Sequence, residues 1–487
     1  MHRKPARWTA LTLDRGLSHL PHPGVLQNAT YLTEGIGRMA SITLTVTNNS
    51  GTPDTDVYLG FWGSSLSATI NGAAMTAQTW YALSTITSFT IEDTTSGRIY
   101  VAYSAPSCTI DPNASILTGN DDIFDKFELT FDGTPTGCAD LTAIDFWSIP
   151  MSLEASFQGT STGSLAGLTG STTAADVYTA LAALSDPVQS TPAAKAVIAA
   201  FAADGNPLPA GVSQQLLNPA SGVVTDGSGN FVRIIGPNSY PPFGSPSTDA
   251  MPGLPATPYD TFLSYYDALI ETFGPKTTAP VPGFTSLGGG TIALIKGNFA
   301  GNDKETGPIY EAQTYDLTAS IDAAGTITLS GSTGQFSTVT ITIDRWNLLN
   351  PAASYGANPA FSLNGGALQT PGNDVWGWVL GDLFAGLNIG AIGSAVTVQG
   401  SGGTIAVGDM ASSDWFSTLP GQGLLFAALW PTGITNHWNQ WAAALNPCSQ
   451  AYNFAFAERF SAPQLNLNPA SVDTLTVTLL DRTVTSG

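Results

Sequence analysis

Short segments in which apolar and polar residues alternate recur along this chain, and they constrain its fold more than any other feature of the sequence. Residues 41–49, 56–62, 88–93 and 97–104 have this pattern and are separated by Asn, Gly, Asp and Ser. Successive side chains of a strand point to opposite faces of a sheet, so each segment has one apolar and one polar face. Short strands at this spacing are typical of an all-β sandwich or barrel.

The regions on either side of these strands have a different character. Residues 1–28 have mixed charge and no periodicity, so we expect an N-terminal tail there, followed by the first β region at 29–157. From about residue 158 the composition changes, and residues 161–172 are rich in Gly, Ser and Thr, which predicts a linker. With 487 residues the chain is long enough for two lobes, and we expect the second to start here.

Helical patterns follow the predicted linker. Thr172 or Thr173 is the expected N-cap of a first helix, which Pro187 ends. Thr191 and Pro192 start a second helix that stops near residue 205. Because these patterns succeed a run of strands, they predict a lobe of mixed α/β structure.

The clearest helical pattern spans residues 257–275. Thr257 is its expected N-cap, Pro258 lies in its first turn and Gly274 ends it. An apolar stripe at helical spacing predicts that one side of this helix faces a core. The stripe contains Phe262, Tyr265, Tyr266, Leu269, Ile270 and Phe273.

Alternating segments return in the second half of the chain. They lie at residues 291–299, 315–322, 325–331, 338–344, 452–460 and 474–481. Asp374 is the expected cap of a helix at 374–388, and residues 436–445 predict a short helix. The segments at 452–460 and 474–481 are expected to be the last two strands.

The charge balance excludes several classes of partner. The chain has 15 basic and 36 acidic residues and a net charge of −21, whereas nucleic acids and anionic membranes require clustered Lys and Arg. A neutral polymer is the easier ligand, and 11 Trp, 14 Tyr and 22 Phe supply flat faces that can stack on sugar rings. We expect a monomer. Export is inferred from the Gly-, Ser- and Thr-rich composition alone, because residues 1–16 have no apolar run long enough for a signal-peptide core.

Histidine and cysteine are too scarce for most metal and nucleophile chemistry. Three of the four histidines lie in the N-terminal tail, which leaves His437, and no GxSxG motif precedes it. We therefore expect no metal and no cofactor. Cys108 and Cys138 flank a strand and either form a disulfide or stay as two reduced thiols, with Cys448 left over. Acid/base chemistry by carboxylates remains.

The best-placed carboxylates lie between residues 127 and 151. Residues 127–131 alternate so that Glu128 and Thr130 share one side of a strand, and residues 143–149 alternate with Asp145 and Trp147 together. If these strands are neighbours, Glu128 and Asp145 face the same way at roughly 5 to 8 Å. Two carboxyls about 6.5 to 9.5 Å apart suit an inverting glycosidase. The alternative is that both acids simply form the solvent-facing side of a sheet.

Residues 96–106, 127–151 and 448–460 form three blocks that resemble glycoside hydrolase family 64, the β-1,3-glucanases of the thaumatin-like superfamily. Residues 96–106, SGRIYVAYSAP, are similar to a Gly-Arg-Ile-aromatic strand of these proteins. FELTF followed by AIDFWSIPM resembles their Glu-Phe-Thr and Val-Asp-Phe strands, and residues 448–460, CSQAYNFAFAERF, resemble their aromatic strand that ends in Asp-Asp. Here Ala457, Glu458 and Arg459 stand where those proteins have the acid pair.

The resemblance implies a role for each matched acid. Glu128 is expected to protonate the departing glycosidic oxygen and Asp145 to activate water, which gives inversion. This division of roles predicts that Glu128 is buried beside Trp147, which raises its pKa, and that Asp145 stays ionised in a wetter position. Asp140, five residues before Asp145, is expected to line the cleft, and Glu458 to reach a sugar hydroxyl. Further expected substrate contacts are Thr130, Trp147, Tyr452, Phe456 and Trp376.

The resemblance also implies an architecture. It predicts a mainly β fold in which a thaumatin-like barrel or sandwich, formed by residues 29–157 and 436–487, is interrupted by a mixed α/β lobe at 158–435. A wide groove between the two would bind β-1,3-glucan of the laminarin or curdlan type. Candidate groove walls are Trp376, Trp378, Trp415, Trp438 and Trp441. The competing class is a non-catalytic thaumatin-like protein that binds β-glucan without cleaving it.

Overall fold

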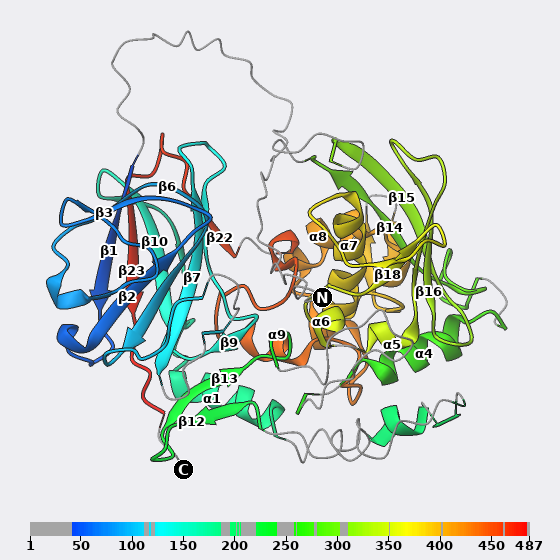
Figure 1. Cartoon of the computed structure of the whole chain (residues 1–487). Helices are drawn as coiled ribbons and strands as arrows, with labels where there is room; N and C mark the ends of the chain where they lie inside the picture. The colour runs from blue at the N-terminus through cyan, green and yellow to red at the C-terminus, as the bar shows by residue number, and fades with distance from the viewer. Residues whose placement is uncertain are drawn as a thin grey trace, which may run out of the picture.

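A computed structural model gives the structure of most of the chain. It describes residues 41–111, 116–117, 122–186, 195–200, 202–203, 205, 221–240, 258–259, 261–276, 280–301, 310–349, 351–400, 403–460 and 463–484. The predicted tail and the predicted helix signals at Thr191, Pro192, Thr257 and Pro187 lie outside these residues. Figure 1 shows two lobes, with the first on the left and the second on the right.

The first lobe is a 12-stranded sheet whose main path runs in the order β11-β10-β23-β1-β6-β7-β8-β22. Its strands are β1 Ile42–Asn48, β2 Val57–Trp62, β3 Ser65–Ile70, β4 Ala73–Ala74, β5 Trp80–Ala82, β6 Phe89–Tyr103, β7 Ile123–Phe131, β8 Cys138–Leu141, β10 Met151–Phe157, β11 Thr160–Leu165, β22 Gln464–Asn466 and β23 Thr474–Leu479. The two segments predicted at 88–93 and 97–104 are one strand, β6, with an irregularity opposite β7 between Thr94 and Gly97.

The last strand, β23, is an internal strand of this sheet. β23 lies between β10 and β1, antiparallel to the first and parallel to the second. Leu475, Val477 and Leu479 point into the core that Ile42 and Leu44 of β1 also enter, while the threonines between them are more exposed. The alternation in the sequence therefore predicts both strands correctly.

Two predicted segments of the first lobe are wrong. Residues 160–165 form β11, which pairs with β10, so most of the first half of the predicted linker belongs to the sheet. Residues 452–460 are not a strand but turns followed by a short helix, η6 Ala457–Arg459. Phe456 has a left-handed backbone with φ 68°, and its ring lies against Gly381, where a Cβ atom would meet it at 2.5 Å. Because of this packing, the residues around Phe456 do not extend and pair as a strand.

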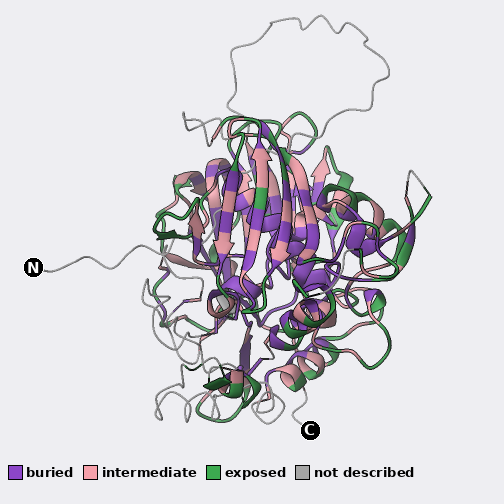
Figure 2. Cartoon of the chain, turned by 90° about the vertical axis from the view of Figure 1, so that its right-hand side faces the viewer, coloured by how far each residue is buried: buried purple, intermediate pink, exposed green. Residues whose placement is uncertain are grey.

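The second lobe is built on a six-stranded antiparallel sheet. Its strands follow the order β14 Thr291–Phe299, β15 Gln313–Ile321, β16 Ile327–Thr333, β17 Val339–Ile343, β18 Phe361–Leu363 and β19 Leu368–Gln369. Figure 2 shows this sheet face-on, with buried residues alternating with more exposed ones along its strands. The helices α4 Leu263–Phe273, α7 Val375–Ile389 and α8 Ser412–Thr418 share one hydrophobic core with it. The mainly β fold with a mixed α/β lobe is thus confirmed.

The helix caps were predicted with mixed success. Thr173 caps α1 Ala174–Leu184 and exchanges hydrogen bonds with Asp176, and Asp374 caps α7 through the N–H groups of Trp376 and Gly377. α4 starts at Leu263 rather than near Pro258, although Gly274 does end it and its predicted stripe is buried except for Ile270. Smaller helices are α5 Arg345–Leu348, α6 Pro351–Ser354 and α9 Gln440–Leu445.

A small sheet and α9 lie where the two lobes meet. β9 Phe146–Trp147 pairs with β13 Phe231–Ile235, which pairs with β12 Val223–Thr225. Trp441 of α9 donates from Nε1 to the Ala143 carbonyl at 2.9 Å, so α9 is tied to the loop before β9. Remaining elements are the two-stranded β20 Thr397–Gly400 and β21 Gly403–Ala406 and the short helices η1 Asp54–Asp56, η2 Leu83–Thr85, η3 Val407–Asp409, η4 Pro420–Gln422 and η5 Phe426–Leu429.

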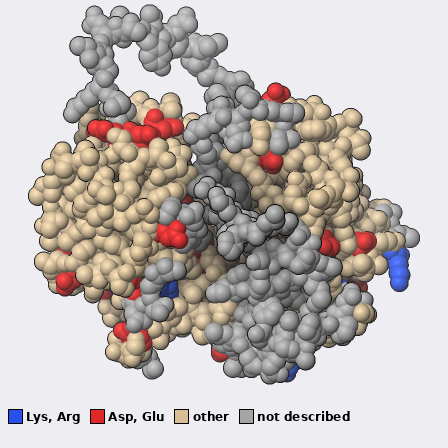
Figure 3. All heavy atoms as spheres, viewed as in Figure 1, with Lys and Arg blue, Asp and Glu red and all other residues tan. Residues whose placement is uncertain are grey.

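The surface agrees with the acidic composition. On the face drawn in Figure 3, the largest group of Asp and Glu lies along the upper edge of the first lobe, others are scattered, and Lys and Arg are few. Within the described part of the chain, no helix is long and apolar enough to cross a membrane.

Cys108, Cys138 and Cys448 are all free thiols, so the reduced alternative holds in this structure.

Candidate active site

One face of β7 carries the polar side chains of the site. Phe127, Leu129 and Phe131 enter the core of the first lobe, which leaves Glu128 and Thr130 on the opposite face as predicted. Lys126 has the same parity as Glu128 and therefore shares that face. The segment is held by pairing with β6 on one side and β8 on the other.

The sheet register places five side chains in a row across this face. Glu128 is opposite Arg98 of β6 and opposite Asp140 of β8. Trp62 of β2 extends the row beyond Arg98, and Gln464 of β22 extends it beyond Asp140. Directly opposed residues have Cβ atoms about 4.5 to 5.5 Å apart. The acid on the strand beside Glu128 is therefore Asp140 rather than Asp145.

Asp145 reaches the same site from a loop. It lies in the bend before β9, and β9 pairs with β13 instead of β7, so the predicted strand at 143–149 is largely wrong. The Asp145 carbonyl accepts the Gly236 N–H at 2.7 Å. Its carboxylate accepts from Ser239 Oγ at 2.5 Å and from Asn238 Nδ2 at 3.1 Å, both at Oδ1. These contacts hold the loop against the turn that follows β13.

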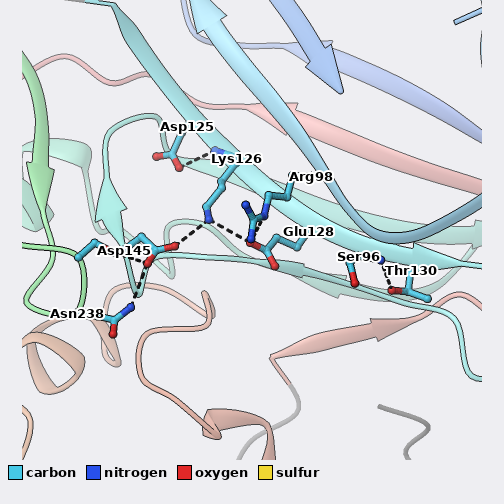
Figure 4. Close-up of polar contacts among 9 residues, drawn as sticks. Ser96, Arg98, Asp125, Lys126, Glu128, Thr130, Asp145 and Asn238 are labelled. Atoms are coloured by element: carbon cyan, nitrogen blue, oxygen red, sulfur yellow. Dashed lines mark hydrogen bonds and ion pairs between the residues drawn. The ribbon is translucent and has the colours of Figure 1, made fainter. Parts of the chain in front are cut away.

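Lys126 lies between the two predicted catalytic acids. Its side chain is 1% exposed, and Nζ lies 2.8 Å from Asp145 Oδ2 and 3.1 Å from Glu128 Oε1 (Figure 4). Burial lowers the pKa of Lys126, but Asp145 and Glu128 outweigh this and raise it overall. The ammonium group therefore stays charged. Lys126 was not among the residues predicted from the sequence, although its spacing of two from Glu128 places it on the same face of the strand.

Asp145 is ionised for a reason other than the predicted one. We expected it in a wetter position than Glu128, yet it is 7% exposed. Burial raises its pKa, but the charge and hydrogen bond of Lys126 together with the Ser239 hydroxyl bring the pKa below its usual value. A buried cation, rather than hydration, thus keeps Asp145 ionised.

Glu128 is the more accessible of the two acids. Its side chain is 33% exposed, and Oε1 lies 3.4 Å from Arg98 Nε as well as 3.1 Å from Lys126 Nζ. We expected it to be buried beside Trp147. Trp147 instead lies in a separate core and stacks on Phe231 with ring centroids 5.9 Å apart. Glu128 is consequently a carboxylate with cations on one side and solvent access.

Asp140 has the opposite environment to Asp145. It is 9% exposed, and its pKa is raised well above the usual value by burial and then by the negative charges of Glu128 and Glu458. Glu458 belongs to η6, which the chain brings in from the far end of the sequence. Asp140 therefore tends to keep a proton where Asp145 does not.

The other predicted contact residues have varied positions. Thr130 lies on the site face, where its Oγ1 accepts the Ser96 N–H at 3.2 Å. Tyr452 is 8% exposed, its backbone pairs with Leu141 and Ala143, and its Oη accepts the Phe456 N–H at 2.7 Å. The tryptophans proposed as groove walls are mostly core residues: Trp376 is 4% exposed, Trp415 0%, Trp438 8% and Trp441 1%.

A buried carboxylate behind the site fixes the path of the chain after Asp145. Asp125 accepts the N–H groups of Ser148 and Ile149, both at 2.8 Å, and that of Lys126 at 2.8 Å. Burial raises the pKa of Asp125 to about 7, and these amide donors oppose that rise. The strand that carries Lys126 is therefore linked to the segment that carries Asp145 by backbone as well as side-chain contacts.

The described residues include no group of three or more His, Cys, Asp or Glu side chains arranged to hold a metal ion. The chemistry that these side chains can perform is proton transfer: one carboxylate is accessible, one is buried and ionised, and one is buried with a raised pKa. Pairs of acids with divided protonation states are the usual arrangement for general acid and base catalysis.

Comparison with known proteins gives matches among solved structures alone. No protein-family model and no curated protein matches the chain. A β-1,3-glucanase domain of glycoside hydrolase family 64 from Clostridium beijerinckii is 12% identical, covers 92% of this chain and 100% of its own, and has a TM-score of 0.43. A laminaripentaose-producing β-1,3-glucanase in complex with laminaritetraose is 13% identical, covers 91% and 99%, and has a TM-score of 0.47. The family 64 enzyme from Paenibacillus barengoltzii is 17% identical over 42% of this chain and 50% of its own, with a TM-score of 0.24.

Proposed function

We propose that this protein hydrolyses β-1,3-glucan, with Glu128 as the general acid and Asp145 as the general base. The observation that carries the proposal is the arrangement of these two carboxylates around Lys126 on one polar face, with Glu128 accessible and Asp145 buried and ionised. The three sequence blocks that resemble family 64 supply the substrate class.

The chemistry requires this division of labour. Cleavage of a glycosidic bond passes through an oxocarbenium-like transition state, so the leaving oxygen gains a proton while the attacking water loses one. Asp145, whose pKa is lowered, is charged at neutral pH and suited to accept the proton from water. Glu128 is more exposed, so its carboxyl, once protonated, can approach the glycosidic oxygen.

The glucan would lie in a groove between the lobes. Asp140, opposite Glu128, and Thr130, two residues further along β7, are the proposed contacts of the first lobe, and Glu458 is the contact from η6. Tyr452, Phe456, Trp147 and Trp376 are buried, so they would support the surrounding structure rather than contact the glucan directly. A neutral polysaccharide also avoids repulsion from a chain of net charge −21.

The test compares Glu128→Gln with the native protein on laminarin and curdlan. We expect the native protein to release reducing sugar and Glu128→Gln to lose at least about 100-fold in kcat, because a positioned acid contributes roughly that much or more. Glu154→Gln is the matched control, since Glu154 is an exposed residue on β10 of the same sheet. Near-native activity of Glu128→Gln would sink the assignment.

Inversion is a separate part of the proposal, because the two contacts with Lys126 keep the nearest oxygens of Glu128 and Asp145 within about 6 Å, between the carboxyl separations typical of retaining and inverting enzymes. The anomer released first from a β-linked glucan distinguishes the two stereochemical outcomes, because an inverting enzyme gives the α form and a retaining enzyme the β form. Proton NMR of the earliest products measures this. A dominant β anomer would assign retention and make one of the acids a nucleophile instead of a base.

A non-catalytic glucan-binding protein is the second candidate, and one observation favours it. Arg98 and Lys126 both approach the same oxygen of Glu128, which suits a charged carboxylate, whereas a general acid must carry a proton. A pure binder sediments with insoluble curdlan and releases no sugar.

An extracellular, monomeric protein is expected for either function, and cell fractionation with gel filtration tests this.

A further inference from the structure

We propose that Lys126 is a positioning residue that fixes the Glu128 and Asp145 carboxylates relative to one another and keeps Asp145 in its charged form. The inference rests on the proposed function, which it deepens. Glu128 is fixed by the strand that it shares with Lys126, whereas Asp145 belongs to a loop. A contact between the strand and that loop therefore decides whether the two acids face one substrate together.

The contacts of Lys126 are built for such a role. Nζ lies within hydrogen-bonding distance of Asp145 Oδ2, at 2.8 Å, and of Glu128 Oε1, at 3.1 Å. Both contacts join an ammonium to a carboxylate and are therefore of the stronger, charge-assisted kind. Since the two oxygens share one nitrogen, they cannot lie more than about 6 Å apart (Figure 4).

Burial makes Lys126 dependent on both acids. A lysine that is 1% exposed loses nearly all its hydration, and this loss is tolerable when opposite charges replace the water. Arg98 repels the ammonium, while Tyr100 of β6 interacts with it more weakly than the two carboxylates do. The balance holds as long as Glu128 and Asp145 both stay near Nζ.

The same balance governs Asp145. The groups that face its carboxylate are Lys126 from β7, Arg98 from β6, and Asn238 with Ser239 from the turn after β13. Burial raises its pKa and Lys126 provides the largest opposing effect. Without Lys126 the pKa of Asp145 rises, so a base that must be ionised starts to work at higher pH.

The experiment measures kcat and KM from pH 3 to pH 9 for Lys126→Met and Lys126→Arg. For Lys126→Met we expect kcat to fall at least about 100-fold, KM to stay within about threefold, and the acidic limb of kcat/KM to move up by about one pH unit or more. Lys296→Met is the matched control, because Lys296 forms an exposed pair with Asp316 in the second lobe. It should keep the native profile.

An unchanged acidic limb in folded Lys126→Met would overturn the inference, since a purely structural lysine does not set the charge of Asp145. If Lys126→Met does not fold, Lys126→Arg decides. That variant retains the charge but alters its reach, so we expect an unchanged limb with kcat lowered about tenfold or more. Native kcat in Lys126→Arg would show that the position of the ammonium is immaterial.

Failure of the proposed function gives a different result. If the native protein releases no sugar from either glucan, the hydrolase assignment fails. The titration of Asp145, followed by carboxyl-carbon NMR in the native protein and in Lys126→Met, still tests the inference. A higher titration midpoint of Asp145 in the variant supports the inference that Lys126 keeps Asp145 charged, and identical midpoints overturn that inference.

Discussion

Asp140 shows how strongly a single position depends on its neighbours in the sheet. It lies opposite Glu128 and Gln464 and is almost fully buried, and the negative charge of Glu458 also raises its pKa. Asp145, only five residues later, is similarly buried but contacts a lysine. The two aspartates therefore have pKa values shifted in opposite directions.

The raised pKa of Asp140 predicts a pH-dependent cost to stability. A carboxyl whose pKa is higher in the folded than in the unfolded protein destabilises the fold increasingly as pH rises above the unfolded value of about 3.9. We expect Asp140→Asn to be more stable than the native protein at pH 7, by on the order of 1 kcal/mol or more, and the difference to shrink towards pH 4. Urea denaturation at both values measures it.

Asp316→Asn is the control for this comparison, because Asp316 lies on an exposed strand face and is 61% exposed. It should change the free energy of unfolding by less than about 1 kcal/mol. Loss of stability in Asp140→Asn at pH 7 would contradict the prediction and would mean that Asp140 is ionised and stabilised by a cation.

At the scale of elements, local rules predicted most of the longer strands and several helix ends. Alternation identified β1, β2, β7, β14 and β15, because a half-buried strand needs one apolar face regardless of its partners. It failed for residues 452–460, where Phe456 packs against Gly381 instead of extending. The pattern there reflects burial on several sides, which periodicity alone does not separate from a strand.

The cap of α7 gives a prediction at this scale. Asp374 Oδ1 accepts the N–H groups of Trp376 at 2.9 Å and Gly377 at 3.0 Å. Asp374→Ala removes the acceptor for both and should lower the free energy of unfolding by about 1 to 2 kcal/mol. Thermal or urea denaturation measures the loss.

The matched control for the cap is Asp374→Asn, which keeps a side-chain oxygen at the same position and should lie within a few tenths of a kcal/mol of the native protein. If the Ala and Asn variants are equally stable, the cap contributes nothing beyond the burial of α7.

At the scale of the whole molecule, the segment that follows α9 joins the lobes. Tyr452 pairs by its backbone with Leu141 and Ala143 in the first lobe. Further along, Arg459 forms an ion pair with Asp382 of α7, and its guanidinium lies 4.3 Å from the centre of the Trp378 ring. Glu458, which raises the pKa of Asp140, lies between these two attachments.

The Arg459–Asp382 pair predicts a large effect on stability. Asp382 is 1% exposed in its side chain and also accepts from Tyr315 Oη at 2.6 Å and Ser412 Oγ at 2.9 Å. Arg459→Met leaves that carboxylate without its cation, and we expect a loss of about 3 to 5 kcal/mol. Urea denaturation of this variant measures the loss.

Two comparisons accompany the Arg459 experiment. Lys296→Met removes the cation of an exposed pair and should cost less than about 1 kcal/mol. The double variant Arg459→Met with Asp382→Asn removes both charges and should recover part of the stability. If Arg459→Met costs no more than Lys296→Met, the buried pair does not hold this segment.

The sequence by itself determined most of the longer strands, the helix ends at Thr173, Asp374 and Gly274, and the face of β7 on which Glu128 and Thr130 lie, because each of these depends on neighbours within a few residues along the chain. Tertiary structure alone decided which charges meet. Asp140 became the neighbour of Glu128 through sheet register, and Asp145 was brought in by a loop that pairs elsewhere. Lys126 stays charged inside the protein because both acids arrive at the same nitrogen. Such contacts depend on register and long-range packing, which no local pattern records.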